Sequence, residues 1–388
     1  MRTVAIVGTS LAGLRAAQQL RAKGYSGRLV MIGEEIHRPY DRPPLSKDFL
    51  LGKTSAAELA LGDADDLLAI AARWRLGTRA ERLDPAAGEV VLGDGSRVAA
   101  DGVVIATGAT PRALPGTRRL RGVHTLRSLG DAVALRDELR CGAEVVVVGA
   151  GFIGAEVAST AKALGCSVTV VEAAPVPLAT TLGTRMGAVC ARLHADNGVR
   201  LLAGTGVASL ESAGDQVTGV RLAEGGLLRA DVVVVGIGAV PVTGWLAGSG
   251  IAVSDGVTCD TGGVTGIPAV VAVGDVANIS STRSEHWSAA SEQPAVAVSN
   301  LLAGTTVEHH RKPPYFWSDQ YEKRIQFAGT ARGHDEVRIV EGDPEQRRFV
   351  ASFHKEGTMI GVLGMSSPKP FTALRKRLDR AAAIVQLG

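Results

Sequence analysis

Two stretches of the chain repeat one pattern, in which a short apolar run is followed by glycines and then by an amphipathic segment. In the central copy, four consecutive valines at 145–148 predict a strand that is buried on both faces. Gly149, Gly151 and Gly154 follow in G-x-G-x-x-G spacing and open a predicted helix. In this spacing the first glycine permits a tight turn, the second lets backbone approach a pyrophosphate, and the third lets the helix pack on the strand. The pattern therefore predicts a strand–helix–strand unit that binds a dinucleotide at the N-terminus of its helix.

The second strand of this unit ends at an acidic residue, Glu172. A carboxylate at this place can accept a hydrogen bond from a ribose 2′-hydroxyl. It also disfavours a 2′-phosphate, because two negative charges about 4 Å apart repel by about 4 kcal/mol at an effective dielectric of about 20. We therefore expect NADH to be preferred over NADPH.

The N-terminal copy of the pattern is also complete. Its strand, Thr3–Val7, leads into Gly8-Thr9-Ser10-Leu11-Ala12-Gly13 and an amphipathic helix, with a serine in place of the middle glycine. The following strand ends near Glu34 and Glu35, either of which could hold a ribose, and we favour Glu34. Two such units predict two adenine dinucleotides, and FAD with a nicotinamide nucleotide is the pair between which hydride transfer is useful chemistry.

Three further buried strands end in small or acidic residues. One ends in Ala106-Thr107-Gly108, and another, from residue 231, ends in Gly236-Ile237-Gly238-Ala239. Small residues at these places let the backbone lie close to a ligand. A third strand is followed by Gly274-Asp275, and ligands of open α/β sheets bind at the carboxyl ends of the strands. Asp275 is therefore a candidate ligand residue, although it could also serve as a helix N-cap.

The last part of the chain has a different pattern. Residues 311–314 have the composition of a linker, and the next seven, YFWSDQY, hold much of an aromatic content of only 4%. Polar and apolar residues alternate from there to about residue 362, which predicts a small antiparallel sheet. A terminal helix with several basic residues follows.

Composition limits the possible classes. A length of 388 residues allows two or three domains, and 46% hydrophobic and 21% charged residues are typical of a globular protein. The formal net charge of +3 gives no reason to expect a nucleic-acid partner, and no apolar run has the length of a membrane span. We expect no signal peptide and a cytoplasmic location.

The four cysteines, Cys141, Cys166, Cys190 and Cys259, are scattered and none forms C-x-x-C. We expect buried free thiols in a reducing compartment and no metal site. A disulfide reductase needs a redox cysteine pair near its flavin, and a flavin peroxidase or water-forming oxidase needs one reactive cysteine. Because no cysteine precedes Cys141, both classes are disfavoured.

Six motifs, in order, extend the argument over nearly the whole chain: RPYDRPPLSK, IATGATPR, VVGAGFIGAEVA, AVGDVA, EHW and YFWSDQY. Together they resemble the FAD-dependent NADH:ferredoxin reductases that serve Rieske-type oxygenases and haem monooxygenases. The resemblance implies an α/β fold with two Rossmann-like dinucleotide-binding domains and a C-terminal α+β interface domain. It implies a discontinuous FAD-binding domain at 1–108 and 230–308, an NAD-binding domain at 109–229, and the interface domain at 309–388.

The resemblance, with the motifs, also implies where the cofactors bind. FAD is expected along the first glycine motif with Ala12 at the pyrophosphate, Ala80 beside the adenine, Asp275 at the ribityl chain and Trp287 by the isoalloxazine. NADH is expected on the second motif, with Glu172 at its ribose. The full set of expected cofactor-binding residues is Gly8, Ala12, Gly13, Glu34, Arg42, Lys47, Ala80, Thr107, Gly108, Arg127, Gly149, Gly151, Gly154, Glu172, Gly238, Asp275 and Trp287.

Three residues are expected to serve the reaction itself. By the resemblance, Lys47 and Glu156 form an ion pair beside the flavin, and Trp317 approaches the flavin near the protein surface. Lys47 is expected to stabilise negative charge on the reduced flavin.

The chain departs from the family pattern at two places. The family often has an arginine shortly after the ribose-binding acid, but this chain reads Pro-Leu-Ala-Thr at 177–180, so nucleotide binding is expected to be weaker or to use Arg185. Ala289 and Pro294 stand where the family usually has asparagine and glycine, and we attach no consequence to either.

The implied reaction is hydride donation from NADH to FAD, followed by return of two electrons, one at a time, to an iron–sulfur ferredoxin. Such a partner is commonly acidic, docks transiently, and would be steered by basic residues such as Lys323, Arg324, Arg375 and Lys376. The expected protein is a monomer or weak homodimer. A rubredoxin reductase and an NADH-responsive redox sensor similar to apoptosis-inducing factor remain as alternatives.

Overall fold

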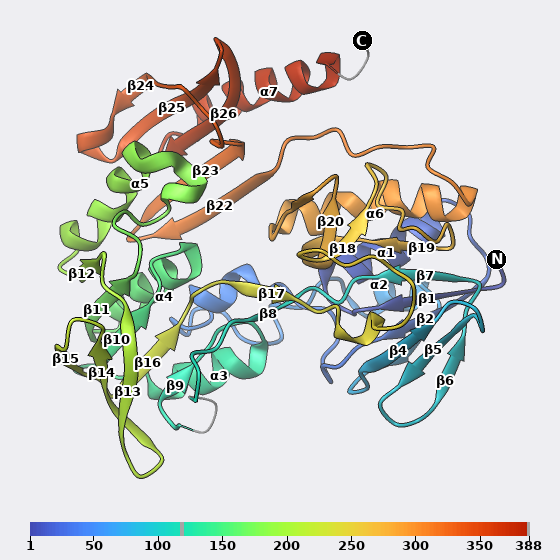
Figure 1. Ribbon diagram of the computed structural model, residues 1–388, viewed down its shortest axis with the longest axis horizontal. Helices are drawn as coiled ribbons and strands as arrows, with labels where there is room; N and C mark the ends of the chain where they lie inside the picture. The colour runs from blue at the N-terminus through green and yellow to red at the C-terminus, as the bar shows by residue number, and fades with distance from the viewer. Residues whose placement is uncertain (117–119, 386–388) are drawn as a thin grey trace. The chain divides into compact units, whose positions relative to one another are not determined.

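A parallel sheet forms the centre of the first of two units in the computed structural model, which describes residues 1–116 and 120–385 (Figure 1). This unit comprises residues 1–41, 59–110 and 240–314. Its strands lie in the order β19-β7-β1-β2-β3. Their bounds are Thr3–Val7 (β1), Arg28–Ile32 (β2), Ala72–Arg75 (β3), Gly102–Ile105 (β7) and Val270–Ala272 (β19).

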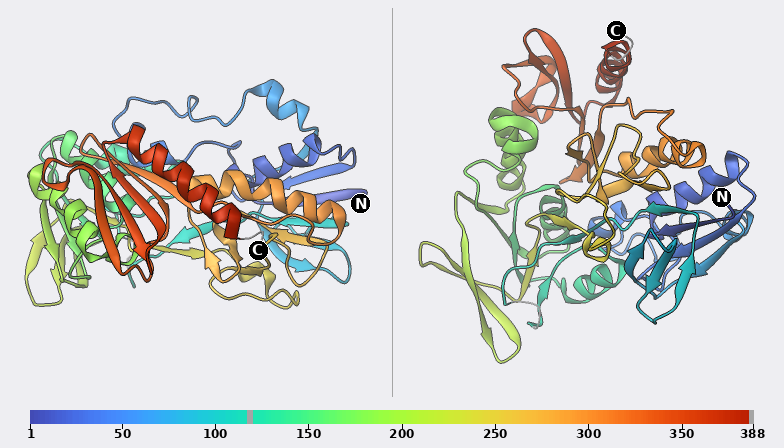
Figure 2. Two further views of the ribbon diagram at one scale, coloured as in Figure 1. Left: turned by 90° about the horizontal axis from the view of Figure 1, so that it is seen from above. Right: turned by 45° about the vertical axis from the view of Figure 1, so that its right-hand side comes forward.

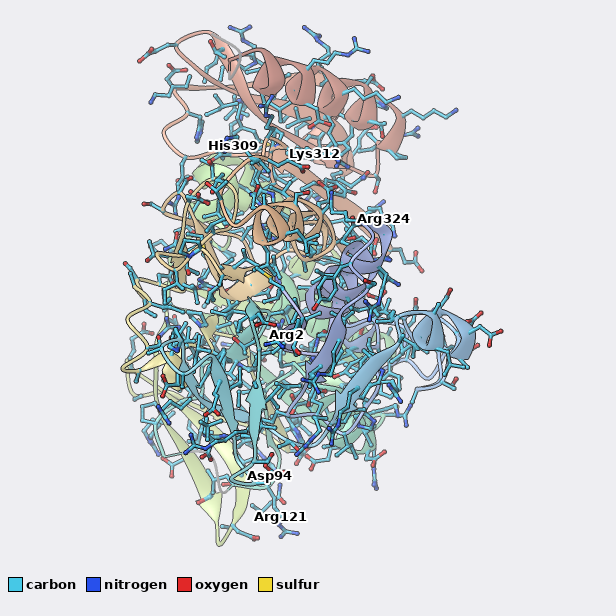
Figure 3. The ribbon with its side chains drawn as sticks, turned by 90° about the vertical axis from the view of Figure 1, so that its right-hand side faces the viewer. Arg2, Asp94, Arg121, His309, Lys312 and Arg324 are labelled. Carbon is cyan, nitrogen blue, oxygen red and sulfur yellow. The ribbon has the colours of Figure 1, made fainter. Side chains whose placement is uncertain are left out.

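Alternate residues of these strands enter two separate cores. Ile6 packs with the helices α1 (Leu11–Ala22) and α6 (Trp287–Ala303) on one face. Ala5 packs on the other face against the antiparallel strands β4 (Ala80–Asp84), β5 (Glu89–Leu92) and β6 (Arg97–Ala99). Asp94 lies at the tip of the β5–β6 hairpin (Figure 3). The unit is completed by α2 (Ala64–Ala69), β18 (Val257–Cys259), β20 (Ala277–Ile279), β21 (Thr282–Arg283) and the 3-10 helices η2 (Gly244–Leu246) and η3 (Gly274–Val276).

The second unit comprises residues 42–58, 111–239 and 315–388 and contains another parallel sheet, in the order β12-β11-β10-β16-β9. The strands are β9 (Val123–His124), β10 (Glu144–Val148), β11 (Ser167–Glu172), β12 (Arg200–Ala203) and β16 (Val232–Val235). Helix α4 (Phe152–Ala163) follows β10, and the antiparallel strands β13 (Val207–Ala213), β14 (Gln216–Leu222) and β15 (Leu227–Arg229) share a core with β10 and β16. The remaining helices are α3 (Leu129–Glu138), α5 (Ala179–Asp196) and the 3-10 helix η1 (Pro43–Ser46).

The C-terminal part of this unit is the predicted antiparallel sheet, in the order β22-β23-β26-β25-β24. Its strands are β22 (Tyr315–Gln320), β23 (Lys323–Gly329), β24 (Glu336–Asp343), β25 (Arg348–Lys355) and β26 (Thr358–Met365), with the 3-10 turn η4 (Pro344–Gln346). Helix α7 (Pro368–Val385) lies across one face (Figure 2), and Phe371 packs there with Val350 and Val362.

Buried and charged contacts join the C-terminal sheet to α4 and α5. The Phe316 ring lies 4.7 Å from that of Phe152 on α4. His194 on α5 and the Tyr321 hydroxyl are 2.7 Å apart, and burial lowers the pKa of His194 to about 4, so its imidazole is neutral at ordinary pH. Arg347 pairs with Asp196 of α5 at 2.7 Å.

The predicted fold class is confirmed, but two predicted boundaries differ from the structure. The strand expected in the second FAD-domain segment, β16, pairs with β10 in the second sheet, where Val235 lies opposite Val148. A run of valines fits the centre of either parallel sheet, so the sequence did not show which one it enters. Residues 42–58, expected in the FAD-binding domain, group with the second unit. The short strands β8 (Ala109–Pro111) and β17 (Ala239–Pro241) pair where the chain crosses between units.

No helix in the described ranges has the length and apolar character that a bilayer span requires.

Candidate functional site

The first glycine motif is fixed by a crowded turn after β1. Gly8 has a φ of +114° and donates its N–H to the Ile32 carbonyl at 2.8 Å. A Cβ on Gly8 would lie 2.0 Å from the Ala106 carbonyl oxygen, so no other residue fits there. The turn therefore places the end of β1 directly against the Ala106-Thr107-Gly108 segment that follows β7. The Thr107 hydroxyl donates to the Val242 carbonyl at 2.8 Å, which holds that segment in place.

Helix α1 begins just after this turn and packs closely on it. A Cβ on Gly13 would lie 1.8 Å from the Gly8 carbonyl oxygen, so the third glycine permits this close approach. Ser10, at the position of the middle glycine, has an extended backbone with φ −85°. Its counterpart Gly151 has φ −70°, so this position needs no left-handed conformation and a serine can stand there.

The second glycine motif repeats these contacts. Gly149 has a φ of +101°, and a Cβ on it would lie 2.4 Å from the Gly236 carbonyl oxygen. A Cβ on Gly154 would lie 2.1 Å from the Gly149 carbonyl, whereas one on Gly151 would meet nothing within 4 Å. Strand β16 therefore pairs with β10 in the second sheet in the same way that β7 pairs with β1 in the first sheet. Gly238 corresponds to Gly108 and belongs to this second motif, not to the FAD-domain segment in which the predicted boundary placed it.

The acidic residues after the second strand of each motif are placed differently. Glu172 ends β11, and its carboxylate accepts the backbone N–H groups of Ala150 and Ala174, each at 2.8 Å. The corresponding position after β2 is Gly33, where a Cβ would lie 2.1 Å from the Thr9 hydroxyl. Glu34 therefore comes one residue later and is exposed.

Glu35 is already engaged, because its carboxylate accepts the Tyr40 hydroxyl at 2.5 Å. This contact favours Glu34 over Glu35 as the available acid.

Other candidate residues of the first unit come from the start of α1, from η3, from the start of α6 and from β4. Gly274 approaches Ala12, since a Cβ on Gly274 would lie 2.9 Å from the Ala12 Cβ. Asp275 follows within η3, and its N-cap is Val273, so Asp275 is not itself the cap. Trp287 opens α6 and donates its indole N–H to Asp41 at 2.8 Å. Ala80 is the first residue of β4.

The candidates in residues 42–58 belong to the second unit. Arg42 donates to the Arg127 carbonyl at 2.6 Å, which brings these two predicted residues together. Arg127 directly precedes Ser128, the N-cap of α3, whose hydroxyl accepts the Asp131 N–H in a capping box.

The predicted ion pair between Lys47 and Glu156 is present. The ammonium lies 2.9 Å from the carboxylate, and the two side chains are 17% and 7% exposed. Glu156 projects from α4, so the pair joins the segment of η1 to the helix of the second glycine motif.

Three further groups donate to this carboxylate, and sequence reasoning missed all of them. The Ser46 hydroxyl lies 2.5 Å from one carboxylate oxygen, and the Ser318 hydroxyl lies 2.7 Å from the other. The Asp319 N–H donates at 3.3 Å. Period-2 alternation in β22 could have indicated that Ser318 faces the interior, but not which helix it meets.

Trp317 lies on the opposite face of β22 from Ser318 and is half-buried. Its ring stacks with Tyr315 at 6.1 Å between centroids, and the Arg375 guanidinium lies 3.8 Å from the Tyr315 centroid. Arg324 is paired with Asp319 at 2.7 Å. Two of the four basic residues expected to steer a partner are therefore engaged locally.

One expectation about the cysteines is corrected, and the use of Arg185 in nucleotide binding stays a prediction. The Arg185 guanidinium donates to the Val337 carbonyl of β24 at 3.1 Å. Cys141 is exposed, whereas Cys166, Cys190 and Cys259 are buried as expected; all four are free thiols.

The predicted site residues thus form two groups, each gathered within its own unit. The first unit holds Gly8, Ala12, Gly13, Glu34, Ala80, Thr107, Gly108, Asp275 and Trp287. The second holds Arg42, Lys47, Arg127, Gly149, Gly151, Gly154, Glu156, Glu172, Gly238 and Trp317. Each unit has a glycine turn that no Cβ could enter and a helix N-terminus behind it, which is the arrangement that holds a dinucleotide pyrophosphate. The residues present therefore fit two such cofactors.

Known proteins are similar in sequence to this chain over nearly its whole length. Residues 2–294 match the family described as pyridine nucleotide-disulphide oxidoreductase, and residues 315–386 match the domain described as reductase C-terminal. Rhodocoxin reductase of Rhodococcus erythropolis is 35% identical over 383 residues, covering 97% of this chain and 89% of its own. The benzene 1,2-dioxygenase system ferredoxin–NAD(+) reductase subunit of Pseudomonas putida is 36% identical over 389 residues, covering 99% and 93%.

A solved structure agrees with the sequence relatives. The covalent putidaredoxin reductase–putidaredoxin complex matches with a TM-score of 0.93 and 32% identity, over 98% of this chain and 93% of that one. The family uses FAD and NAD(H), as the two glycine motifs predict. By both of its domains and by its relatives, the chain belongs to the pyridine nucleotide-disulphide oxidoreductases, among their FAD-dependent ferredoxin–NAD reductases.

Proposed function

We propose that this protein is an NADH:ferredoxin reductase that passes electrons through FAD to an iron–sulfur ferredoxin of an oxygenase system. The observation that carries the proposal is the presence of two complete dinucleotide turns in a chain that its ferredoxin-reductase relatives match almost end to end. Bound FAD supplies a carrier that takes two electrons together and can release them singly.

We assign the two dinucleotides to separate turns. FAD is held at the Gly8 turn, where the N-terminal N–H groups of α1 meet its pyrophosphate, with Glu34 available for its ribose. NADH is held at the Gly149 turn, with Glu172 at its adenine ribose. The assignment implies an FAD-binding domain built from 1–41, 59–110 and 240–314, an NAD-binding domain at 111–239, and an interface domain from 315.

Within the Lys47–Glu156 ion pair, the Lys47 ammonium is a positive charge held in a fixed position for the reaction. With Glu156 held by Ser46, Ser318 and the Asp319 N–H, its carboxylate keeps Lys47 in one position. By resemblance, this ammonium lies beside bound FAD, where it stabilises negative charge and needs no reorganisation during turnover.

The outer face of β22 is proposed to serve the ferredoxin. Trp317 and Tyr315 form a stacked aromatic surface there. Lys323 and Lys376, which have no ion pair among the described residues, carry positive charge on elements next to it. Electrostatic steering of an acidic ferredoxin by these lysines weakens as salt rises.

Anaerobic stopped-flow absorbance tests the proposed function directly. The purified protein should be yellow, its flavin should bleach rapidly on mixing with NADH, and the reduced protein should then reduce a ferredoxin. A colourless protein that cannot take up FAD would contradict the assignment of the Gly8 turn. Slow bleaching followed by a long-lived charge-transfer band would favour the redox sensor instead.

Substitution of Glu172 by glutamine should shift the coenzyme preference. The amide keeps one oxygen, which can accept either the Ala150 or the Ala174 N–H group but not both, and it removes the negative charge facing a 2′-phosphate. We expect the ratio of kcat/KM for NADPH to that for NADH to rise about tenfold, or about 1.4 kcal/mol. Steady-state kinetics with both coenzymes measures this ratio.

Glu224→Gln is the matched control, because it removes one carboxylate from an exposed turn of the same unit and should leave the ratio unchanged. An unchanged ratio in Glu172→Gln would show that Glu172 does not discriminate between the coenzymes.

A further inference from the structure

Two cysteines lie at the edge of the second parallel sheet that is remote from its glycine turn. Strands β10 and β11 are parallel neighbours, with Glu144 opposite Ser167 at their starts. Cys141 comes three residues before β10, and Cys166 comes directly before β11. Because adjacent parallel strands begin at the same edge of a sheet, the two cysteines meet there although 25 positions (166 − 141) separate them in sequence.

Backbone and side-chain contacts bring the two segments together. The Gly142 N–H donates to the Gly165 carbonyl at 3.0 Å. The Cys141 sulfur lies 2.9 Å from the place that a Cβ on Gly165 would take. The Cys166 thiol in turn donates to the Arg140 carbonyl at 3.3 Å. Each thiol therefore lies against the loop that carries the other.

The two thiols differ in accessibility. Cys141 is exposed, whereas Cys166 is only 3% exposed. Burial raises the pKa of Cys166, and a nearby negative charge on Cys141 would raise it further. Cys141 is thus the thiol that a dissolved oxidant meets first, and Cys166 is the one placed to react second.

A surface cavity of about 700 Å³ reaches Cys166 from outside, and Gly142 and Gly165 also line it. Three cationic side chains line the same cavity, Lys162, Arg200 and Arg229, against one carboxylate, that of Glu144. None of the three cations forms an ion pair with any residue in 1–116 or 120–385. The thiolate is the form that attacks sulfur, so the raised pKa of Cys166 agrees with its reacting second.

We propose that Cys141 and Cys166 are a peroxide-sensitive thiol pair that closes reversibly to a disulfide. The Cys141 thiol loses its proton, its thiolate attacks one oxygen of hydrogen peroxide, and the O–O bond breaks to give a sulfenic acid and hydroxide. The hydroxide takes up the proton that the thiol released and becomes one water. The Cys166 sulfur then attacks the sulfenic sulfur, the S–O bond breaks, and a second water leaves with the thiol proton. Two thiols have lost two electrons, and one peroxide has become two waters. A dithiol such as dithiothreitol reverses the reaction by exchange.

This site is independent of the proposed function. It contains none of the residues assigned to FAD, NADH or the ferredoxin, and it lies at the opposite ends of β10 and β11 from Gly149 and Glu172. If the two thiols do not form a disulfide, the reductase assignment is unaffected. If the reductase assignment is wrong, the thiol proposal is likewise unaffected.

Peptide mapping of the flavin-loaded protein tests the proposal. After brief exposure to hydrogen peroxide, free thiols are blocked with iodoacetamide and the protein is digested with trypsin without reductant. Cleavage after Arg140, Lys162 and Arg185 puts the two cysteines on separate peptides, 141–162 and 163–185. We expect these peptides to be joined, and dithiothreitol to separate them. Alkylation of both thiols after peroxide, a stable sulfinic acid on Cys141, or a Cys141–Cys141 link between two chains would each overturn the proposal.

Three variants sharpen the result. Cys190→Ser removes a buried thiol of the same unit and should leave the cross-link intact. Cys141→Ser should abolish it, and Cys166→Ser should leave Cys141 as a sulfenic acid that dimedone labels. A cross-link that involves Cys190, or one that persists without Cys166, would contradict the pairing. Bleaching of the flavin by NADH should be unchanged in all three variants, which shows that each has folded.

Discussion

Replacement of Gly8 by alanine should give a protein that cannot hold FAD. The added methyl group would lie 2.0 Å from the Ala106 carbonyl oxygen, and the residue would be held at a φ of +114°. Relief requires that β1 and the segment after β7 move apart, which breaks the turn that the proposed pyrophosphate site needs. The ratio of flavin absorbance near 450 nm to protein absorbance at 280 nm measures the loss (about 450 nm is the usual visible maximum of a bound flavin). We expect this ratio to fall to about zero, since the substitution acts on a fully packed contact.

Gly24→Ala is the matched control for this substitution. Gly24 also has a positive φ, +82°, and lies in the same unit, but a Cβ there would meet nothing within 4 Å. The Gly24→Ala substitution should lower the free energy of unfolding by about 1 kcal/mol, because of backbone strain alone. The variant should keep its FAD and its yellow colour. A Gly8→Ala protein with a full complement of FAD would show that the first turn is not the flavin site.

The two nucleotide-binding units could be predicted from sequence because their signals are local. Glycine spacing, the valine run at 145–148 and the acidic residue Glu172 are each read from a few neighbouring residues, and the structure places these three features where the sequence predicts them. The same locality explains the misplaced boundary. Strand β16 is 84 residues beyond the end of β10 (232 − 148), and no local pattern tells which of two similar sheets a valine strand joins.

The surroundings of Glu156 could be predicted only in part. The resemblance supplied its partner Lys47, which comes from a segment 109 residues away, but no pattern indicated that Ser46 and Ser318 donate to the same carboxylate. These contacts depend on how η1, α4 and β22 pack together. Cys141 shows the same limit, because its exposure and its nearness to Cys166 follow from strand order and not from spacing.

The Glu156 carboxylate is the point where three separate segments of the second unit meet. It accepts from Lys47 of the segment 42–58 and from Ser318 of the C-terminal sheet, while it stands itself on the helix of the second glycine motif. Trp317, next in the chain to Ser318, points to the other face of β22. The carboxylate therefore fixes the proposed flavin-side cation and the strand of the proposed ferredoxin surface through a single group.

Replacement of Glu156 by leucine should destabilise the protein by about 3–5 kcal/mol, because removal of one member of a buried pair leaves the other charge without compensation. The Lys47 ammonium, 17% exposed, would lose its partner, and the hydroxyls of Ser46 and Ser318 would lose their acceptor. Chemical denaturation of the flavin-loaded protein, followed by circular dichroism, measures the change in the free energy of unfolding. Flavin reduction by NADH should slow as well, because Lys47 is no longer held in place.

The double variant Lys47→Met/Glu156→Leu separates the pair's own contribution from the cost of an isolated charge. Removal of both charges should recover much of the lost stability, because a buried ion pair is often no more stabilising than apolar side chains of similar size. Flavin reduction should stay slow, since the ammonium is absent. Glu89→Gln breaks the exposed pair with Arg97, whose side chains are 58% (Arg97) and 27% (Glu89) exposed, and should cost no more than about 1 kcal/mol. A Glu156→Leu protein as stable as the Glu89→Gln protein would show that the four contacts to Glu156 do not hold these segments together.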